Sequence, residues 1–333
     1  MATLGPLRMC RAARRGAPLF SARAAATTAS FPAQRLAPGK MRAAHAFYSS
    51  SASDDKPVEL VYDLHRPEKP IADDKTKPIL FLHGLFGSKK NNRSISKMLA
   101  RDLGRSIYAL DLRNHGESPH APKHDYVSLA GDVSHFIKEH GLKETTVIGH
   151  SMGAKTAMTL ALSEPDLVAD IVAVDNAPVD AAIGSDFAKY VRGMKQIDRT
   201  HITRQAEADK LLQPFESSLV VRQFLLGNMH RVKPDDSSSP VLKFRIPLDI
   251  LARALDNMGD FPYKDPSAIR FNKPALFVRG TKSKYVADEA LPIIGQFFPK
   301  FELVDIDAGH WVISESPEAF RQAVVRFLTP EEE

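Results

Sequence analysis

Short, uninterrupted apolar runs alternate with longer amphipathic segments from residue 57 to the C-terminus. The runs predict strands that are buried on both faces of a sheet, because such strands have no polar face. We expect these strands over 58–64, 78–83, 106–112, 145–149, 168–175, 274–280 and 301–307. The amphipathic segments predict helices over 95–103, 126–142, 152–163, near 287–298 and near 317–328. The alternation predicts an α/β fold with a mostly parallel central sheet and helices on both faces.

The alternation stops between residues 176 and 272, where helical patterns occur with no buried strand between them. One such pattern covers 211–229, and a polar stretch, KPDDSSSP, follows at 233–240. We therefore expect a helical lid over 176–272, inserted after the strand that ends at Asp175. Residues 54–333 are predicted to form a single domain that carries this lid.

The first 53 residues differ from the rest of the chain in charge. They contain seven Arg, one Lys and no acid, and the only cysteine, Cys10, lies among them. Such an Arg-rich, Ala-rich segment is typical of a mitochondrial presequence, so we expect residues 1–53 to direct the protein to the mitochondrial matrix. Without these eight residues, 37 of the 45 basic residues remain, against 40 acidic residues. Residues 54–333 therefore carry a net charge of −3, and their composition gives no support for nucleic-acid binding. No run of 18 apolar residues predicts a transmembrane helix.

The pentapeptide GHSMG, residues 149–153, matches the pattern G-x-S-x-G between a predicted strand and a predicted helix. A sharp strand-to-helix turn strains the backbone of Ser151, and it requires small residues two positions before and after. Gly149 and Gly153 meet this requirement. The pattern predicts that Ser151 is a nucleophile; the alternative is a tight turn in which its hydroxyl only caps the following helix.

A nucleophilic serine needs a base, and the base follows the acid in chain order in enzymes with a doubly wound sheet. His310 follows the last predicted strand, so its imidazole should lie at the same edge of the sheet as Ser151. We expect His310 to be the base. His83 and His150 are expected to brace loops, and His115 to lie in a turn.

The acid that orients the base has two candidate positions. The usual position is the loop after the strand 274–280, but this loop carries Ser283 there, and Asp288 already lies in the next predicted helix. The strand before it ends at Asp175, where a carboxylate could reach His310 from the neighbouring side. We favour Asp175 as the acid; the alternative is that it only caps the loop at the end of its strand.

Acyl transfer also needs two backbone N–H groups that bind the oxyanion of the tetrahedral intermediate. One comes from the residue after the nucleophile, here Met152, and the other from the loop that follows the strand 78–83. This loop reads HGLFGS, and Gly84 allows its backbone to approach closely. We therefore expect the amides of Leu85 and Met152 to form the oxyanion hole.

Four segments together resemble the α/β-hydrolase family: HGLFGS (83–88), DLRNHGESPH (111–120), GHSMGAKTAM (149–158) and VDNAP (174–178). More specifically, they look like the mitochondrial abhydrolase-domain subfamily that includes the fungal ethanol acetyltransferases. The resemblance runs from about residue 57 to the end, and it implies the α/β-hydrolase fold. It also implies that Ser151, Asp175 and His310 are nucleophile, acid and base in acyl chemistry on esters or thioesters, without a metal or redox cofactor.

The expected function is that of a serine esterase or thioesterase that forms an acyl-Ser151 intermediate on a small-molecule substrate. Two alternatives remain open. With an alcohol as acceptor and acetyl-CoA as a substrate, the same intermediate would make the protein an alcohol acetyltransferase. In a different class, the fold could be a non-catalytic scaffold that binds a matrix protein. No H-E-x-x-H, Walker or G-x-G-x-x-G pattern supports a metalloprotease or a nucleotide-binding enzyme.

Overall fold

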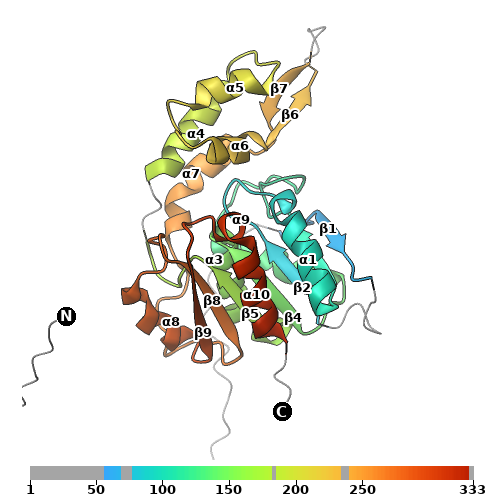
Figure 1. The fold of residues 1–333 in the computed structure, drawn as a ribbon, viewed down its shortest axis with the longest axis vertical. Helices are drawn as coiled ribbons and strands as arrows, with labels where there is room; N and C mark the ends of the chain where they lie inside the picture. Colours follow the sequence, from blue (N-terminus) through green and yellow to red (C-terminus); the bar gives the residue numbers. More distant parts are fainter. Residues whose placement is uncertain (1–55, 69–76, 182–184, 234–239, 330–333) are drawn as a thin grey trace, which may run out of the picture. The chain divides into compact units, whose positions relative to one another are not determined.

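The computed structural model describes residues 56–68, 77–181, 185–233 and 240–329 (Figure 1). The predicted presequence, residues 1–53, lies outside these ranges. Within them, no helix is both long and apolar enough to cross a membrane.

A seven-stranded sheet forms the centre of the domain (Figure 1). Its order is β1-β3-β2-β4-β5-β8-β9, and all neighbouring strands are parallel except β1 and β3. The prediction of a mostly parallel sheet is confirmed. The strands are β1 (Tyr62–His65), β2 (Ile79–Leu82), β3 (Ile107–Leu110), β4 (Thr145–His150), β5 (Val168–Val174), β8 (Ala275–Gly280) and β9 (Phe301–Ile306).

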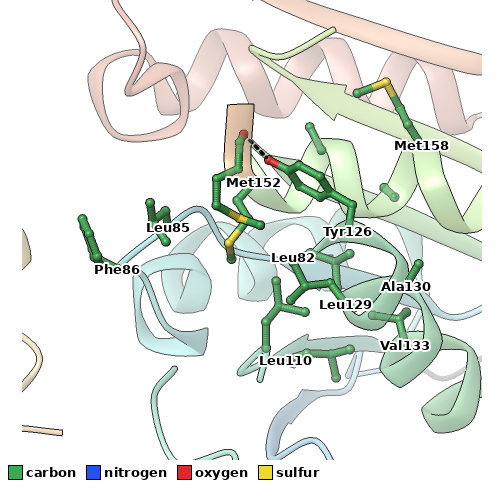
Figure 2. Packing of buried hydrophobic residues seen from close by; sticks show 14 of the residues in the cluster. Leu82, Leu85, Phe86, Leu110, Tyr126, Leu129, Ala130, Val133, Met152 and Met158 are labelled. Atoms are coloured by element: carbon green, nitrogen blue, oxygen red, sulfur yellow. Dashed lines mark hydrogen bonds between the residues drawn. The ribbon is translucent and has the colours of Figure 1, made fainter. Parts of the chain in front are cut away.

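Helices cover both faces of the sheet, because alternate residues of each buried strand point to opposite sides. On one face, α1 (Arg93–Leu103), α9 (Val312–Glu315) and α10 (Pro317–Leu328) pack on residues such as Phe81. On the other face lie α2 (Tyr126–Glu139), α3 (Met152–Ser163) and α8 (Leu291–Phe297). Figure 2 shows this second core, where Leu129 and Val133 of α2 lie beside Leu82 and Leu110 of the sheet. Short 3-10 helices are η1 (Lys89–Asn92), η2 (Pro165–Leu167) and η3 (Asp288–Ala290).

The insertion between β5 and β8 is mainly helical, as expected, but it also contains an antiparallel hairpin (Figure 1). Its elements are α4 (Ser185–Asp198), α5 (Gln205–Leu212), α6 (Leu219–Leu226), β6 (Met229–Val232), β7 (Val241–Phe244) and α7 (Leu248–Gly259). The pattern at 211–229 is not one helix. Pro214 cannot continue α5, and Ser218 begins α6 by accepting a hydrogen bond from the amide of Val221.

Buried hydrogen bonds join the insertion to the helices of the domain. Nζ of Lys155, on α3, donates to the carbonyl oxygens of Gly259 and Asp260 at 2.7 and 2.9 Å. Burial lowers the pKa of Lys155 to about 8, and the two carbonyls at the end of α7 satisfy its ammonium group. The hydroxyl of Tyr126 donates to the carbonyl oxygen of Met258, 2.9 Å away (Figure 2). These contacts fix the returning end of the insertion against α2 and α3.

Candidate active site

Ser151 lies at a strained turn between β4 and α3. Its φ of 55° and ψ of −113° place a non-glycine residue in an unfavourable backbone region. The turn is held by its amide, which donates to the carbonyl oxygen of Val174 at 2.9 Å. A Cβ on Gly153 would lie 2.5 Å from the carbonyl oxygen of Leu82, and a Cβ on Gly149 would collide with the backbone of Gly153. The two glycines are therefore required by close packing, as the motif predicted.

Two hydrogen bonds link Ser151, His310 and Asp175, which come from three different loops at the carboxyl edge of the sheet. Nε2 of His310 lies 3.0 Å from Oγ of Ser151, and its Nδ1 lies 2.7 Å from Oδ2 of Asp175. Asp175 is fully buried, and Ser151 is 7% exposed. The structure thus brings together the three side chains that the sequence singled out. The arrangement matches a nucleophile, a base and the carboxylate that orients the base.

The carboxylate of Asp175 accepts three hydrogen bonds. Besides His310, the donors are the amide of Gly280, 3.1 Å from Oδ1, and the hydroxyl of Ser283, 2.5 Å from Oδ2. The end of β8 and the loop that follows it, the usual position of the acid, therefore contribute donors to a carboxylate that follows β5. Asp288 lies in η3 instead, where its 80% exposed side chain pairs with Arg279 at 2.5 Å.

Two further residues position the imidazole of His310. The ring of Tyr285 stacks on it with centroids 4.0 Å apart and planes inclined by 24°. Nε2 of His150 lies 2.7 Å from the carbonyl oxygen of His310, and burial, followed by the charge of His310, lowers the pKa of His150 to about 4. Neutral His150 therefore donates to this carbonyl. Sequence reasoning missed the stacking of Tyr285 and the hydrogen bond of Ser283. Nothing in the local pattern indicates that Ser283 contacts Asp175, 108 positions earlier in the chain, or that the ring of Tyr285 stacks on that of His310.

The turn after β2 carries Leu85, whose amide is one of the two expected oxyanion donors, and Met152, the other, is the first residue of α3 (Figure 2). Among the described residues, neither the amide of Leu85 nor that of Met152 donates a hydrogen bond within the protein. The turn itself is braced by histidines, as expected for His83. The amide of Phe86, whose φ is 62°, donates to Nε2 of His115 at 3.0 Å, and the amide of Leu112 donates to Nε2 of His83 at 3.0 Å.

Burial keeps both of these histidines neutral. It lowers the pKa of His83 and lowers that of His115 well below its ordinary value, so each ring can accept a hydrogen bond from a backbone amide. In the described ranges, no group of three or more His, Cys, Asp or Glu side chains is placed to hold a metal ion. The site therefore contains a serine hydroxyl hydrogen-bonded to an imidazole, a buried carboxylate on the other side of that ring, and two backbone N–H groups without an acceptor, which are the kinds of group that acyl transfer uses.

Comparison with known proteins assigns the chain to a family. The α/β hydrolase fold family matches residues 77–317. The chain belongs to the α/β-hydrolase family. This α/β-hydrolase is 42% identical over 292 residues to the "Probable alcohol acetyltransferase" of Saccharomyces cerevisiae, and the match covers 83% of the chain and 85% of the relative. It is 38% identical over 283 residues to the sn-1-specific diacylglycerol lipase ABHD11 of Mus musculus, with coverages of 83% and 87%.

A solved structure shows the same fold. A marine microorganism esterase superimposes on this α/β-hydrolase with a TM-score of 0.73 at 32% sequence identity, covering 81% of the chain and 99% of the esterase. The resemblance to the abhydrolase-domain subfamily and the α/β-hydrolase fold are thereby confirmed, and the chain is an enzyme of the α/β-hydrolase type.

Proposed function

We propose that this α/β-hydrolase is a serine esterase or thioesterase in which Ser151 is the nucleophile, His310 the base and Asp175 the acid. The observation that carries the proposal is the continuous hydrogen-bonded path from Oγ of Ser151 through both ring nitrogens of His310 to the buried carboxylate of Asp175. A hydroxyl alone is a weak nucleophile, so a base within hydrogen-bond distance is the minimum requirement for its activation.

In the first half of the reaction, Oγ of Ser151 attacks the carbonyl carbon of the substrate and transfers its proton to Nε2 of His310. Asp175 holds Nδ1–H of the ring and stabilises the imidazolium that forms. His310 then donates the proton to the leaving oxygen or sulfur, and the acyl group remains on Ser151. In the second half, water attacks the acyl-enzyme through the same base, and the acid is released.

The amides of Leu85 and Met152 are proposed to bind the oxyanion of each tetrahedral intermediate. Loss of one such donor typically lowers the rate by about 10²–10³-fold. Both amides lack an acceptor within the described part of the protein, so they can bind this oxyanion without breaking an existing hydrogen bond. No metal or redox cofactor is needed for this chemistry, and acetyl-CoA would enter only as a substrate.

A second candidate function is alcohol acyltransfer, in which an alcohol replaces water as the acceptor. It is favoured by the 42% identity to the "Probable alcohol acetyltransferase" of Saccharomyces cerevisiae. The lipase ABHD11 of Mus musculus, at 38% identity, favours hydrolysis instead. Both functions use the same acyl-Ser151 intermediate and differ only in which acceptor reaches it.

Product analysis of the purified protein tests both functions. We expect p-nitrophenyl acetate to be hydrolysed, with ethyl acetate formed in addition if ethanol and an acetyl donor are accepted. Ser151→Ala should abolish activity and labelling by a fluorophosphonate while the far-UV spectrum and melting temperature are retained. If Ser151→Ala keeps more than about 1% of the activity, the proposed nucleophile is wrong.

We further propose that residues 1–53 direct the enzyme to the mitochondrial matrix. The proposal is supported by their seven Arg, one Lys and complete lack of acids, because a cationic segment is drawn inward by the negative potential of the matrix. Fusion of residues 1–53 to a fluorescent reporter should carry it into mitochondria. A reporter that stays in the cytosol would remove this part of the proposal.

A further inference from the structure

The aromatic ring of Tyr285 lies face to face with the imidazole of His310. The two ring centroids are 4.0 Å apart, and the planes are inclined by 24°. Two other rings of the described residues contact His310, but neither is stacked on it. The ring of His150 lies 5.0 Å away at 40°, and that of Trp311 lies 5.9 Å away at 65°. Tyr285 is therefore the ring that presents its π face to the proposed base.

The loop after β8 holds Tyr285 in this position. The amide of Ser283 donates to the carbonyl oxygen of Gly280 at 2.9 Å, which turns the chain. The amide of Tyr285 then donates to Oγ of Ser283 at 3.3 Å, and the same hydroxyl donates to Oδ2 of Asp175 at 2.5 Å. Val286, the next residue, is 2% exposed and belongs to the core. A short turn thus attaches Tyr285 to the carboxylate that orients His310.

Hydrogen bonds hold the backbone of His310 on both sides. Oε2 and Oε1 of Glu315 accept from the amides of Gly309 and Trp311, at 2.7 and 3.3 Å. The carbonyl oxygen of His310 accepts from Nε2 of His150 at 2.7 Å. The backbone is therefore fixed without Tyr285, and the stacked ring adds a contact to the face of the imidazole.

A positive charge develops on His310 during the proposed reaction, because its ring takes up the proton of Ser151. The face of an aromatic ring carries partial negative charge, so it attracts a cation within about 6 Å of its centroid. The imidazole of His310 is inside this distance from Tyr285. An imidazolium gains more from this contact than a neutral imidazole, so the contact favours the protonated ring that forms in the transition state.

Few groups next to His310 can stabilise this charge. The carboxylate of Asp175 is fully buried and lies 2.7 Å from Nδ1, so it is one of them. His150 stays neutral, because burial, followed by the charge of His310, lowers its pKa to about 4. Glu315 is exposed and bonds to backbone amides rather than to the ring. The π face of Tyr285 is the second group that favours the charged ring.

The hydroxyl end of half-buried Tyr285 lies near two buried tyrosines, Tyr126 on α2 and Tyr190 on α4 of the insertion. Burial raises the pKa of Tyr126, and the charge of ionised Tyr285 raises it further. Burial and a hydrogen bond to Glu216 raise the pKa of Tyr190, and the charge of Tyr285 contributes again. The stacked pair therefore adjoins buried residues, and a cation–π contact is stronger where water is excluded.

We infer that Tyr285 is a positioning residue that acts through His310 and favours its imidazolium form during acyl transfer. The inference rests on the proposed role of His310 as the base. Oγ of Ser151 bonds to the acyl carbon while its proton moves to Nε2 of His310. The bond from that carbon to the leaving oxygen or sulfur then breaks, and the leaving atom takes the proton. Tyr285 takes no part in these bond changes, but it lowers the energy of the states in which His310 carries the proton.

The test compares two substitutions of Tyr285 in the full chain. Tyr285→Phe keeps the aromatic face and removes the hydroxyl, whereas Tyr285→Leu keeps an apolar side chain and removes the face. Trp311→Leu is the matched control, because it removes a neighbouring ring that meets His310 at 65° instead of stacking on it. For each protein, kcat and KM for p-nitrophenyl acetate are measured from about pH 5 to 8, the range in which a histidine titrates. Thermal melting shows whether each variant is folded.

A second measurement does not depend on turnover. The imidazole of His310 is titrated by NMR in the wild type and in each variant, and its signal is assigned by its loss in His310→Gln. The midpoint of this titration reports directly whether the ring of Tyr285 favours the protonated form.

We expect Tyr285→Leu to lower kcat about fivefold to tenfold with little change in KM, because the ring contacts the base and not the substrate. The pH at which kcat/KM falls to half of its plateau, and the NMR midpoint, should both move down by about 0.5–1 pH unit. Tyr285→Phe and Trp311→Leu should leave both midpoints near their wild-type values.

The inference is overturned if Tyr285→Leu produces no downward shift, or if Tyr285→Phe or Trp311→Leu produces the same shift. A ring that only fills space would admit water when it is removed, and water favours the imidazolium, so the midpoints would stay or move up. Failure of the wild-type protein to cleave p-nitrophenyl acetate would instead contradict the proposed esterase function. The NMR midpoints would still decide whether Tyr285 favours the protonated ring.

Discussion

The hydroxyl of Ser283 lies 2.5 Å from Oδ2 of Asp175, the same oxygen that lies 2.7 Å from Nδ1 of His310. Asp175 follows β5 and Ser283 follows β8, and the two strands are parallel neighbours in the sheet. The sequence offers two positions for the acid, the end of β5 and the loop after β8, and the residues at these positions are in direct contact. One supplies the carboxylate, and the other supplies a donor that holds it.

Removal of this donor should slow the reaction without abolishing it. We expect Ser283→Ala to lower kcat roughly tenfold, because a hydrogen bond to a charged group contributes about 1.5–3 kcal/mol and only part of this affects the orientation of Asp175. Ser283→Thr keeps the hydroxyl and is the matched control. Steady-state kinetics with p-nitrophenyl acetate measure the effect, and an unchanged kcat in Ser283→Ala would show that Gly280 and His310 alone fix the carboxylate.

Two isosteric substitutions test the assignment of the acid. Asp175→Asn should lower kcat by roughly 10³–10⁴-fold, because an amide favours the wrong tautomer of His310 and cannot stabilise its imidazolium. Asp288→Asn should change kcat less than about twofold, since its side chain is 80% exposed and pairs with Arg279. The reverse pattern, with Asp288→Asn inactive and Asp175→Asn active, would move the acid to the loop after β8.

A pair of Gly→Ala substitutions in successive helices should have opposite effects on stability. Gly153→Ala places a Cβ 2.5 Å from the carbonyl oxygen of Leu82, so it should lower the free energy of unfolding by roughly 3 kcal/mol and disturb the turn at Ser151. A Cβ on Gly131, within α2, would meet no neighbouring element within 4 Å, so Gly131→Ala should raise the free energy of unfolding by about 0.5–1 kcal/mol. Urea denaturation measures both, and equal effects would contradict the packing described for the turn.

Stability should fall in mild acid because of buried histidines such as His124. Burial, followed by the charge of Arg113, lowers the pKa of His124 to about 4, while in the unfolded chain it is near 6.5. As the pH falls from 6.5 to 4, only the unfolded state takes up the proton, so the folded state loses up to about 1.4 kcal/mol per pH unit from this group.

The variant His124→Gln tests this pH dependence. Its stability should depend less on pH, so the gap between wild type and variant should narrow as the pH is lowered from 6.5 towards 4. Exposed His120 provides the control, since His120→Gln also removes one histidine, but from the protein surface. Parallel loss of stability in wild type and His124→Gln between pH 6.5 and 4.5 would contradict the prediction.

Local patterns in the sequence determined the elements of the domain and the turn at Ser151. The buried run of β2, the 3.6-residue spacing of α10 and the GHSMG turn each depend on residues within a few positions of one another, so they can be read directly. The hairpin of β6 and β7 escaped this reading, because β6 is only partly buried and β7, although largely buried, is too short to give a strand pattern by itself.

Contacts between distant segments were decided only by the tertiary structure. Asp175 and His310 are 135 positions apart, and the order of β4, β5, β8 and β9 in the sheet brings their loops to one edge. The same strand order places Ser283 against Asp175. Periodicity specifies which face of an element is buried, but the identity of the neighbour across that face depends on strand order and loop path, which no local pattern encodes.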